Sequence, residues 1–289
     1  WSLWSLWSLW SIILIYNPAV CLAAMSNPQI PHTLHSSLPP FIVWHCTVLF
    51  TSTHPLPFHG LSFFRYGYTN VMTVDEYHEQ FPASFPDTLP ASVHGQKIDY
   101  FHDEPIGAVM AIMDPLSWFR DLQICCDVLR SNGRTGNTEG DKKQIVPLYM
   151  SCPDFEYVTE FPIPRFGSGT FGILLQHLYE KLTSNRLQLT WFGKPEPVTY
   201  DYAESQLKEL AQQQGHESVH RIYAIGDNPE SDIQGANNAG DQRTSIMVRT
   251  GMFTGSENHA VHPADVVVGD VGDALEWILK EEKCVSNRF

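Results

Sequence analysis

The sequence predicts an α/β protein built on a mostly parallel, doubly wound sheet, and three observations lead there. Short apolar runs of strand length alternate with stretches that repeat apolar residues at helical spacing. Glycine or Asn-Gly ends several of the helical stretches. The 289 residues, 43% of them hydrophobic, are enough for two modest domains with buried cores. Such alternation implies a sheet covered on both faces, with ligands at the carboxyl ends of its strands.

The first elements that we expect lie in the middle of the chain. Gly107–Met113 (GAVMAIM) is a short apolar run typical of a buried strand. A helix follows, and its expected apolar face consists of Leu116, Phe119, Leu122, Cys126 and Leu129. A strand over Gln144–Cys152, weakened by Pro147, and a helix over Gly169–Leu182 come next.

The remaining elements continue the alternation. We expect strands at Leu187–Phe192, Arg221–Gly226, Ser245–Gly251 and Asp265–Asp270. We expect helices at Val198–Gln214, Glu230–Ala239 and Val271–Glu282. The last helix is predicted to turn Val271, Leu275 and Ile278 inward.

Residues 1–74 differ in composition from the rest of the chain. Arg65 is their only charged residue, whereas all 32 acidic residues lie from Asp75 onward. A globular domain is ordinarily about a quarter charged. The opening WSLWSLWSLW repeats every three residues, which matches neither the helix nor the strand period. We therefore expect residues 1–64 to be an irregular or helical segment outside the fold, followed by domains at 65–185 and 186–289.

Four interpretations of residues 1–64 stay open. The uncharged run of Trp1–Met25 is long enough for a membrane span, but Ser residues and Asn17-Pro18 interrupt it and no Lys or Arg flanks it. A signal peptide lacks its basic start, and a mitochondrial transit peptide lacks its arginines. The remaining interpretation is sequence that is not native to the protein.

Charge and cysteine content exclude several classes of function. A net charge of −14 argues against nucleic acid or an anionic membrane as the main partner, because both select basic surfaces. The six cysteines show no C-x-x-C pair and no metal-ligand spacing. A reduced intracellular chain without a disulfide framework is the simpler interpretation.

The segment IGDNPESDIQGAN, from Ile225 to Asn237, is the sharpest candidate site. Asp227 directly follows a predicted strand, and Asp232 starts the next helix. Mg²⁺ prefers one or two carboxylates together with waters and phosphate oxygens, which suits such a turn. The alternative is an ordinary turn capped by Asn228, with Pro229 at the first helical position.

Lys194, in WFGKPEP, is the second candidate. It lies where a strand ends and a Pro-initiated helix begins, so its ammonium should reach the same crevice. A compact positive charge there can hold a phosphate or offset a neighbouring carboxylate. The alternative is a solvated loop lysine.

Together, Gly193-Lys194-Pro195 and Gly226-Asp227-Asn228-x-x-x-Asp232 resemble the third and fourth motifs of the haloacid dehalogenase (HAD) superfamily of phosphohydrolases. The order of elements is similar to the type IIA branch, which carries an α/β cap domain. Finer likeness to the cat eye syndrome critical region protein 5-like hydrolases rests on GYTNVMTVDEYHEQFP (Gly67–Pro82), RFGSGTF (Arg165–Phe171), FGKPEPVTYDYAE (Phe192–Glu204) and YAIGDNPESDIQGAN (Tyr223–Asn237).

The resemblance implies a cap at 65–185 and the C-terminal half of a partial, Rossmann-like HAD core at 186–289. It also implies phosphoryl transfer through an aspartyl-phosphate, dependent on Mg²⁺, from a small phosphorylated metabolite. Lys194 would stabilise charge, Asp227 would bind Mg²⁺ and Asp232 would support the metal and its waters. Asn228 would orient nearby groups. Some members of the subgroup are mitochondrial, so a cytoplasmic or mitochondrial location is implied.

The departure from the family concerns the nucleophile. Its D-x-D-G motif should lie well upstream of Gly67, and no Asp precedes Asp75. We therefore expect the chain as written to be inactive. Two other functions stay open: a non-catalytic binding or regulatory protein that uses the cap, and a membrane-tethered version that uses residues 1–25.

Gly167-x-Gly169-x-x-Gly172 has the letters of a dinucleotide fingerprint. It follows FPIPRF rather than a clean strand, and no acidic residue stands some twenty residues on. We interpret it as a cap loop that opens a helix, whose backbone N–H groups could face substrate phosphate at Gly167 and Gly169.

Overall fold

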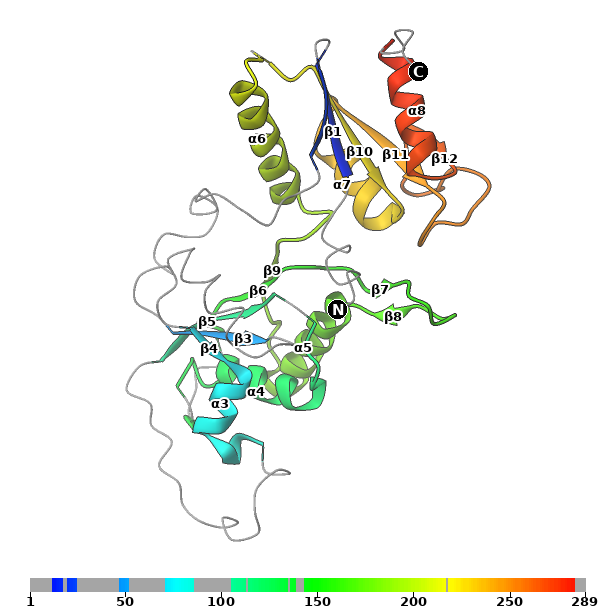
Figure 1. The fold of residues 1–289 in the computed structure, drawn as a ribbon. Coiled ribbons are helices and arrows are strands. Elements are labelled where there is room, and N and C mark those ends of the chain that lie inside the picture. The colour runs from blue at the N-terminus through cyan, green and yellow to red at the C-terminus, as the bar shows by residue number, and fades with distance from the viewer. Residues whose placement is uncertain are drawn as a thin grey trace. The chain divides into compact units, whose positions relative to one another are not determined.

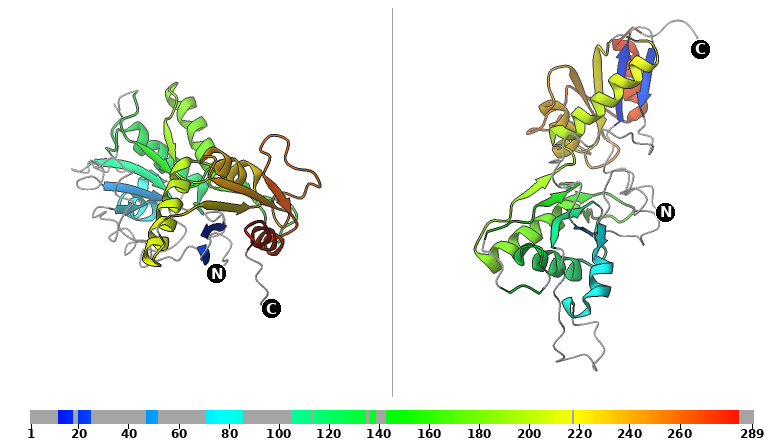
Figure 2. Two further views of the ribbon diagram at one scale, coloured as in Figure 1. Left: turned by 90° about the horizontal axis from the view of Figure 1, so that it is seen from above. Right: turned by 90° about the vertical axis from the view of Figure 1, so that its left-hand side faces the viewer.

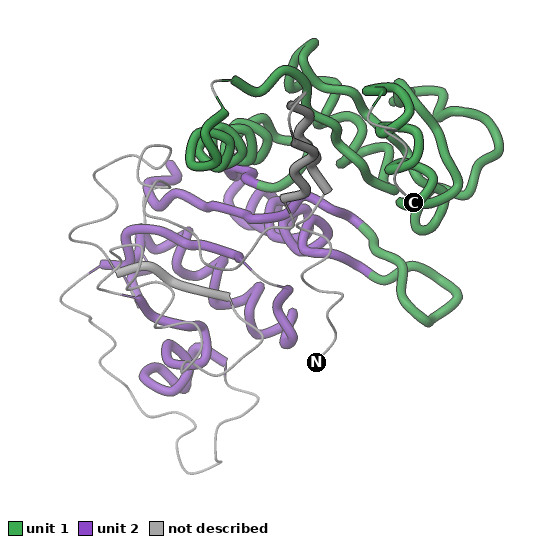
Figure 3. The backbone as a smooth tube through the Cα atoms, turned by 45° about the horizontal axis from the view of Figure 1, so that its top comes forward, with its two compact units in different colours: residues 1–30, 156–165, 193–289 green, residues 31–155, 166–192 purple. Residues whose placement is uncertain are grey.

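The computed structural model describes residues 71–85, 105–112, 114–134, 136–138, 143–216 and 218–283, together with the backbone of three earlier strands. Those strands are β1 (Ile12–Asn17), β2 (Val20–Ala24) and β3 (Thr47–Thr51) (Figure 1). The chain divides into two compact units (Figure 3). One comprises residues 1–30, 156–165 and 193–289, and the other comprises residues 31–155 and 166–192. The domain division predicted from the sequence stays a prediction.

The unit that contains residues 193–289 is built on a five-stranded sheet of order β12-β11-β10-β1-β2. Strands β10 (Arg221–Gly226), β11 (Arg243–Val248) and β12 (Val266–Val268) run parallel, as predicted. Four consecutive residues of β10 are buried, because both faces of the sheet are covered and a parallel strand there needs a continuous apolar run. Strand β1 pairs with β10 in antiparallel sense, and β2 pairs with β1.

Helices cover both faces of this sheet. They are α6 (Pro197–Gln213), α7 (Gln234–Asn238) and α8 (Val271–Glu281), with a π-helical turn at Pro229–Ile233 before α7. Tyr223 and Ile225 of β10 pack toward α8, whereas Ala224 packs with Tyr200 of α6. The right-hand view of Figure 2 shows α6 and α8 on opposite sides of the sheet. This arrangement confirms the doubly wound α/β prediction.

The predicted inward face of α8 was partly wrong. Ala274 and Ile278, four residues apart, are buried at 0% and 2% exposure, whereas Leu275 is 38% exposed. Residues four apart lie on the same face of a helix, and the face that carries Ala274 and Ile278 packs against β10 and β11.

The other unit holds a fully parallel sheet of order β4-β3-β5-β6-β9. Its strands besides β3 are β4 (Val71–Thr73), β5 (Ile106–Ala111), β6 (Leu148–Met150) and β9 (Leu189–Trp191). Its helices are α3 (Val74–Gln80), α4 (Trp118–Arg130) and α5 (Ser168–Thr183), with a 3₁₀ turn at Pro82–Ser84. A short hairpin of β7 (Glu156–Tyr157) and β8 (Arg165–Phe166), of which all but Phe166 belongs to the first unit, precedes α5 in the chain.

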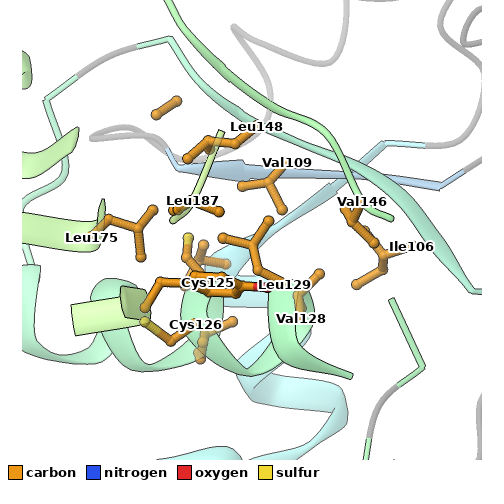
Figure 4. Packing of buried hydrophobic residues seen from close by; sticks show 14 of the residues in the cluster. Ile106, Val109, Cys125, Cys126, Val128, Leu129, Val146, Leu148, Leu175 and Leu187 are labelled. Atoms are coloured by element: carbon orange, nitrogen blue, oxygen red, sulfur yellow. The ribbon is translucent and has the colours of Figure 1, made fainter. Parts of the chain in front are cut away.

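Apolar side chains of α4 and α5 pack against β5 and β6 to form the core of this unit (Figure 4). The predicted face of α4 was wrong at Leu116 and Phe119, which are 78% and 68% exposed. The helix begins only at Trp118, so Leu116 lies ahead of it. The buried residues of α4 are Asp121, Ile124, Cys125, Cys126, Val128 and Leu129.

The prediction of an irregular or helical segment was wrong for the backbone of β1, β2 and β3, which is extended. Their sequences IILIYN, VCLAA and TVLFT are rich in β-branched, aromatic and other apolar residues, which favour strands. The rest of residues 1–64 lies outside the described residues, as do the four interpretations of that segment. Within the part of the chain that the structure describes, no helix has the length and hydropathy of a membrane span. The described cysteines are free and buried: Cys125, Cys126 and Cys152.

Candidate active site

The loop that leaves β10 forms the centre of the candidate site. Asn228 caps the following turn, since its Oδ1 accepts a hydrogen bond of 3.0 Å from the backbone N–H of Glu230. Pro229 occupies the first position of that turn. The capped turn offered as the simpler interpretation is therefore present, and it fixes where the two aspartates lie along the carboxyl edge of the sheet.

Asp232 forms a buried ion pair with Lys194. The Nζ atom lies 2.5 Å from Oδ1, and the two residues are only 6% and 4% exposed. The other oxygen, Oδ2, accepts hydrogen bonds from the backbone N–H groups of Asp227 and Asn228, at 3.1 and 3.0 Å. Both oxygens of Asp232 thus have partners, and Lys194 is not a solvated loop lysine. The Lys194–Pro195 peptide bond is cis.

Asp227 is held differently. Its Oδ2 accepts a hydrogen bond of 2.7 Å from the backbone N–H of Met252, which lies in the loop after β11. Its carbonyl oxygen accepts one of 3.0 Å from the N–H of Phe253. Among the described residues, none donates a hydrogen bond to Oδ1, and Asp227 is only partly buried. The side chain is therefore anchored through one oxygen while the other stays available.

Two glycines make this packing possible. A Cβ atom on Gly226 would lie 2.2 Å from Cβ of Asp232, and one on Gly251 would lie 1.8 Å from Oδ2 of Asp227. Both distances are far below van der Waals contact, so each aspartate occupies the space that a side chain would take. The sequence analysis missed Gly251 and Met252. A glycine as the last residue of a predicted strand was the one signal available, since a backbone N–H donor leaves no mark in a sequence.

Gly167 and Gly169 lie in the other unit, at the start of α5. Gly167 is the residue before the helix, and a Cβ there would lie 2.4 Å from the carbonyl oxygen of Asp154. A Cβ on Gly169 would lie 2.1 Å from the carbonyl oxygen of Pro153. Close backbone packing thus accounts for both glycines, and their predicted role toward substrate phosphate stays a prediction.

Residues 191–274 match a family model described as HAD-hydrolase-like. This region carries Lys194, Asp227 and Asp232, in the order that the resemblance requires. The match makes this region similar to HAD-like hydrolases, in agreement with the superfamily resemblance of the sequence. The type IIA branch and the finer subgroup stay predictions.

Two of the curated proteins that resemble the chain carry the word hydrolase in their names. A cardiolipin synthase (CMP-forming)/mitochondrial hydrolase fusion protein of Schizosaccharomyces pombe is 37% identical over 185 residues, which cover 63% of this chain and 31% of that protein. A mitochondrial hydrolase of Saccharomyces cerevisiae is 30% identical over 214 residues, which cover 64% of this chain and 60% of that protein. The chain thus matches less than two thirds of the length of either relative.

Among solved structures, a thermostable NPPase from Geobacillus stearothermophilus has 21% identity and a TM-score of 0.40. The match covers 58% of this chain and 55% of that one. The family assignment rests on the sequence matches and not on this likeness.

Proposed function

We propose that the chain binds Mg²⁺ and a small phosphorylated molecule at the carboxyl edge of β10, and that it does not turn this ligand over. The observation that carries the proposal is the pairing pattern of the two aspartates. Asp227 keeps one carboxylate oxygen free of hydrogen bonds from the described residues, whereas both oxygens of Asp232 are engaged.

The donor set fits Mg²⁺. This ion takes one or two carboxylates and keeps several waters and phosphate oxygens, so a single available Asp oxygen is a sufficient anchor. The described residues hold no cluster of three or more His, Cys, Asp and Glu side chains that would instead form an all-protein cage. Asp227 is the direct metal ligand in this proposal. Asp232 supports Asp227 by accepting hydrogen bonds from the backbone N–H groups of Asp227 and Asn228.

Each residue has a defined task in this proposal. Met252 N–H holds Oδ2 of Asp227, so that Oδ1 points to one place. Asp232 fixes the ammonium of Lys194, which offsets negative charge on a phosphoryl group. Bound Mg²⁺ would supply further charge neutralisation for the phosphate oxygens. Asn228, whose side chain caps the turn, keeps the backbone of the loop in place.

Turnover would require a nucleophile that these residues do not provide. In the resembled family, the residue that attacks phosphorus is an Asp upstream of the cap. Within the 289 residues of this chain, no Asp or Glu precedes Asp75. Loss of the nucleophile in another covalent hydrolase costs about six orders of magnitude in rate. A binding or regulatory role is therefore favoured over hydrolysis for the chain as given.

The test separates binding from turnover. Mn²⁺, a spectroscopic substitute for Mg²⁺, is titrated into the full chain by electron paramagnetic resonance, with and without inorganic phosphate. Asp227→Asn should abolish binding, whereas Asp201→Asn, which changes an exposed Asp on α6, should leave it unchanged. Hydrolysis of a panel of small phosphate esters should be undetectable. Turnover that Asp227→Asn abolishes would make the chain an enzyme, and absent Mn²⁺ binding would refute the proposal.

We also propose a mitochondrial location, because both curated relatives carry "mitochondrial" in their names. Subcellular fractionation of the source cells tests this. Recovery of the protein outside mitochondria would refute it.

A further inference from the structure

Tyr200 reaches the candidate site from α6. The residue is 1% exposed, and its hydroxyl lies 3.1 Å from the carbonyl oxygen of Ser231 and 3.0 Å from that of Asp232. One phenolic hydrogen is thus shared between two successive carbonyl groups of the π-helical turn. Both acceptors belong to the backbone that carries the Asp232 side chain.

The ring of Tyr200 fits only because residue 235 is glycine. A Cβ atom there would lie 2.3 Å from both Cε2 and the hydroxyl oxygen of the tyrosine. Any side chain at 235 would push the ring out of its place. The backbone of Gly235 therefore packs directly against the ring, and this close packing lets the hydroxyl contact the two carbonyl groups.

Lys194 and Tyr200 hold Asp232 from two directions. Lys194 pairs with its carboxylate, and Tyr200 bonds to its carbonyl group. Lys194 lies just before α6 and Tyr200 lies in its first turn, so one segment of chain fixes both ends of this residue. The carboxylate in turn accepts the N–H groups of Asp227 and Asn228.

We propose that Tyr200 is a positioning residue that sets the geometry of Asp232, and through it that of the Asp227 loop. Loss of the hydroxyl removes a side-chain hydrogen bond from two carbonyl groups of the turn, so the turn samples more conformations and the N–H groups of Asp227 and Asn228 exchange faster. The consequence for metal binding rests on the function proposed above, whereas the consequence for exchange does not.

The experiment compares amide hydrogen exchange of the peptide that spans Gly226–Asp232 in the full chain. Tyr200→Phe should speed exchange at Asp227 and Asn228 about tenfold, the effect expected when a buried hydrogen bond is lost. Tyr223→Phe is the matched control: it removes a hydroxyl from another buried Tyr of the same unit, and that hydroxyl bonds to Glu282. This control should leave exchange in the peptide unchanged.

A second variant guards against a change peculiar to phenylalanine. Gly235→Ala keeps the hydroxyl but displaces the ring, and it should speed exchange at the same two amides. Unchanged exchange in Tyr200→Phe would overturn the proposal, and so would an equal rise in the Tyr223 control, since that would signal general loosening of the unit.

Metal binding provides the readout that a merely structural role would not move. In Tyr200→Phe, Mn²⁺ affinity should fall about tenfold. The far-ultraviolet circular dichroism spectrum, which reports the secondary structure, should stay unchanged. Equal affinity in wild type and variant would overturn the role at the site. If the wild type binds no Mn²⁺, the proposed function fails, and the exchange comparison alone decides the role of Tyr200.

Discussion

The ammonium of Lys194 lies 2.5 Å from the carboxylate of Asp232, and both side chains are almost fully buried. Removing one partner of such a pair leaves a buried charge without its counterion. Lys194→Met should therefore lower the free energy of unfolding by about 3–5 kcal/mol. The control is Lys208→Met, which removes an exposed partner of Glu204 and should cost less than about 1 kcal/mol. Urea titration measures both, and equal losses would contradict the assignment of a buried pair.

Gly251→Ala tests the anchoring of Asp227. The new methyl group would lie 1.8 Å from Oδ2, so the carboxylate has to leave the N–H of Met252. We expect Mn²⁺ affinity to fall about 10–100-fold, as for loss of a group that orients a metal ligand. Thr254→Ala, an exposed change in the same loop, should bind Mn²⁺ as the wild type does. Retained affinity in Gly251→Ala would show that the anchored position of Asp227 is not the binding position.

Ser231 and Ser245 form a matched pair of buried serines. The hydroxyl of Ser231 has no hydrogen-bond partner among the described residues, whereas that of Ser245 bonds to the side chain and backbone of Asp265. Ser231→Ala should leave stability unchanged or raise it by up to about 1 kcal/mol, because an unsatisfied buried hydroxyl is removed. Ser245→Ala should lower it by about 1–3 kcal/mol. Thermal unfolding of both variants measures these changes in stability. A loss of stability in Ser231→Ala as large as that in Ser245→Ala would show that the Ser231 hydroxyl has a hydrogen-bond partner.

Asp121 predicts a pH dependence. Burial raises the pKa of this carboxyl above its ordinary 3.8, although the Arg120 guanidinium beside it acts in the opposite direction. The folded state then holds this proton more tightly than the unfolded state, so ionised Asp121 opposes folding. That penalty is full above the raised pKa, shrinks as the pH falls through it and is gone below 3.8.

Asp121→Asn should therefore be more stable than the wild type at pH 7, and the difference should shrink toward pH 4. Asp75→Asn is the control, because it changes an exposed carboxylate that pairs with the same Arg120. Denaturant titrations at several pH values measure the effect. A difference that grows as the pH falls would contradict the sign.

Leu129, in α4, and Leu116, which lies ahead of this helix, test the apolar face that the sequence predicted. They are 0% and 78% exposed. Leu129→Ala should cost about 2–5 kcal/mol of stability, the usual result of opening a cavity in a core. Leu116→Ala should change stability by less than about 0.5 kcal/mol. A loss in Leu116→Ala as large as that in Leu129→Ala would restore the predicted face, which contains both residues.

Hydrophobic periodicity was enough to predict most elements of the fold. The strand at Arg221–Gly226 was predicted with its observed bounds, because a continuous apolar run between turn residues has few alternatives. The face of α4 was misjudged, since the pattern does not say where the first turn begins. The strand β1 was missed, because its Ile-rich run stands beside a repeat whose period of three residues matches neither the helix nor the strand.

The candidate site was predictable only where its chemistry lies in side chains. Lys194, Asp227 and Asp232 could be found by their spacing, and the structure brings Lys194 and Asp232 into contact. The groups that hold these three side chains in place could not be predicted from the sequence. Met252 contributes a backbone N–H, which every residue except proline possesses. Tyr200 lies inside the helix predicted at Val198–Gln214, but only three-dimensional packing shows which groups its hydroxyl contacts.

The antiparallel pairing of β1 with β10 decides at which edge of the sheet the chain leaves β1. The register sets Tyr16 opposite Arg221, so the chain leaves β1 at the amino end of β10. Asp227 follows the other end, about 20 Å from Arg221 at 3.4 Å per residue. The turn that joins β1 to β2 thus lies at the end of the sheet away from the aspartate, whereas β11 delivers its outgoing loop directly to it. Of the two strands that flank β10, the parallel one, β11, ends at the edge of the sheet that holds Asp227, whereas the antiparallel one, β1, begins there.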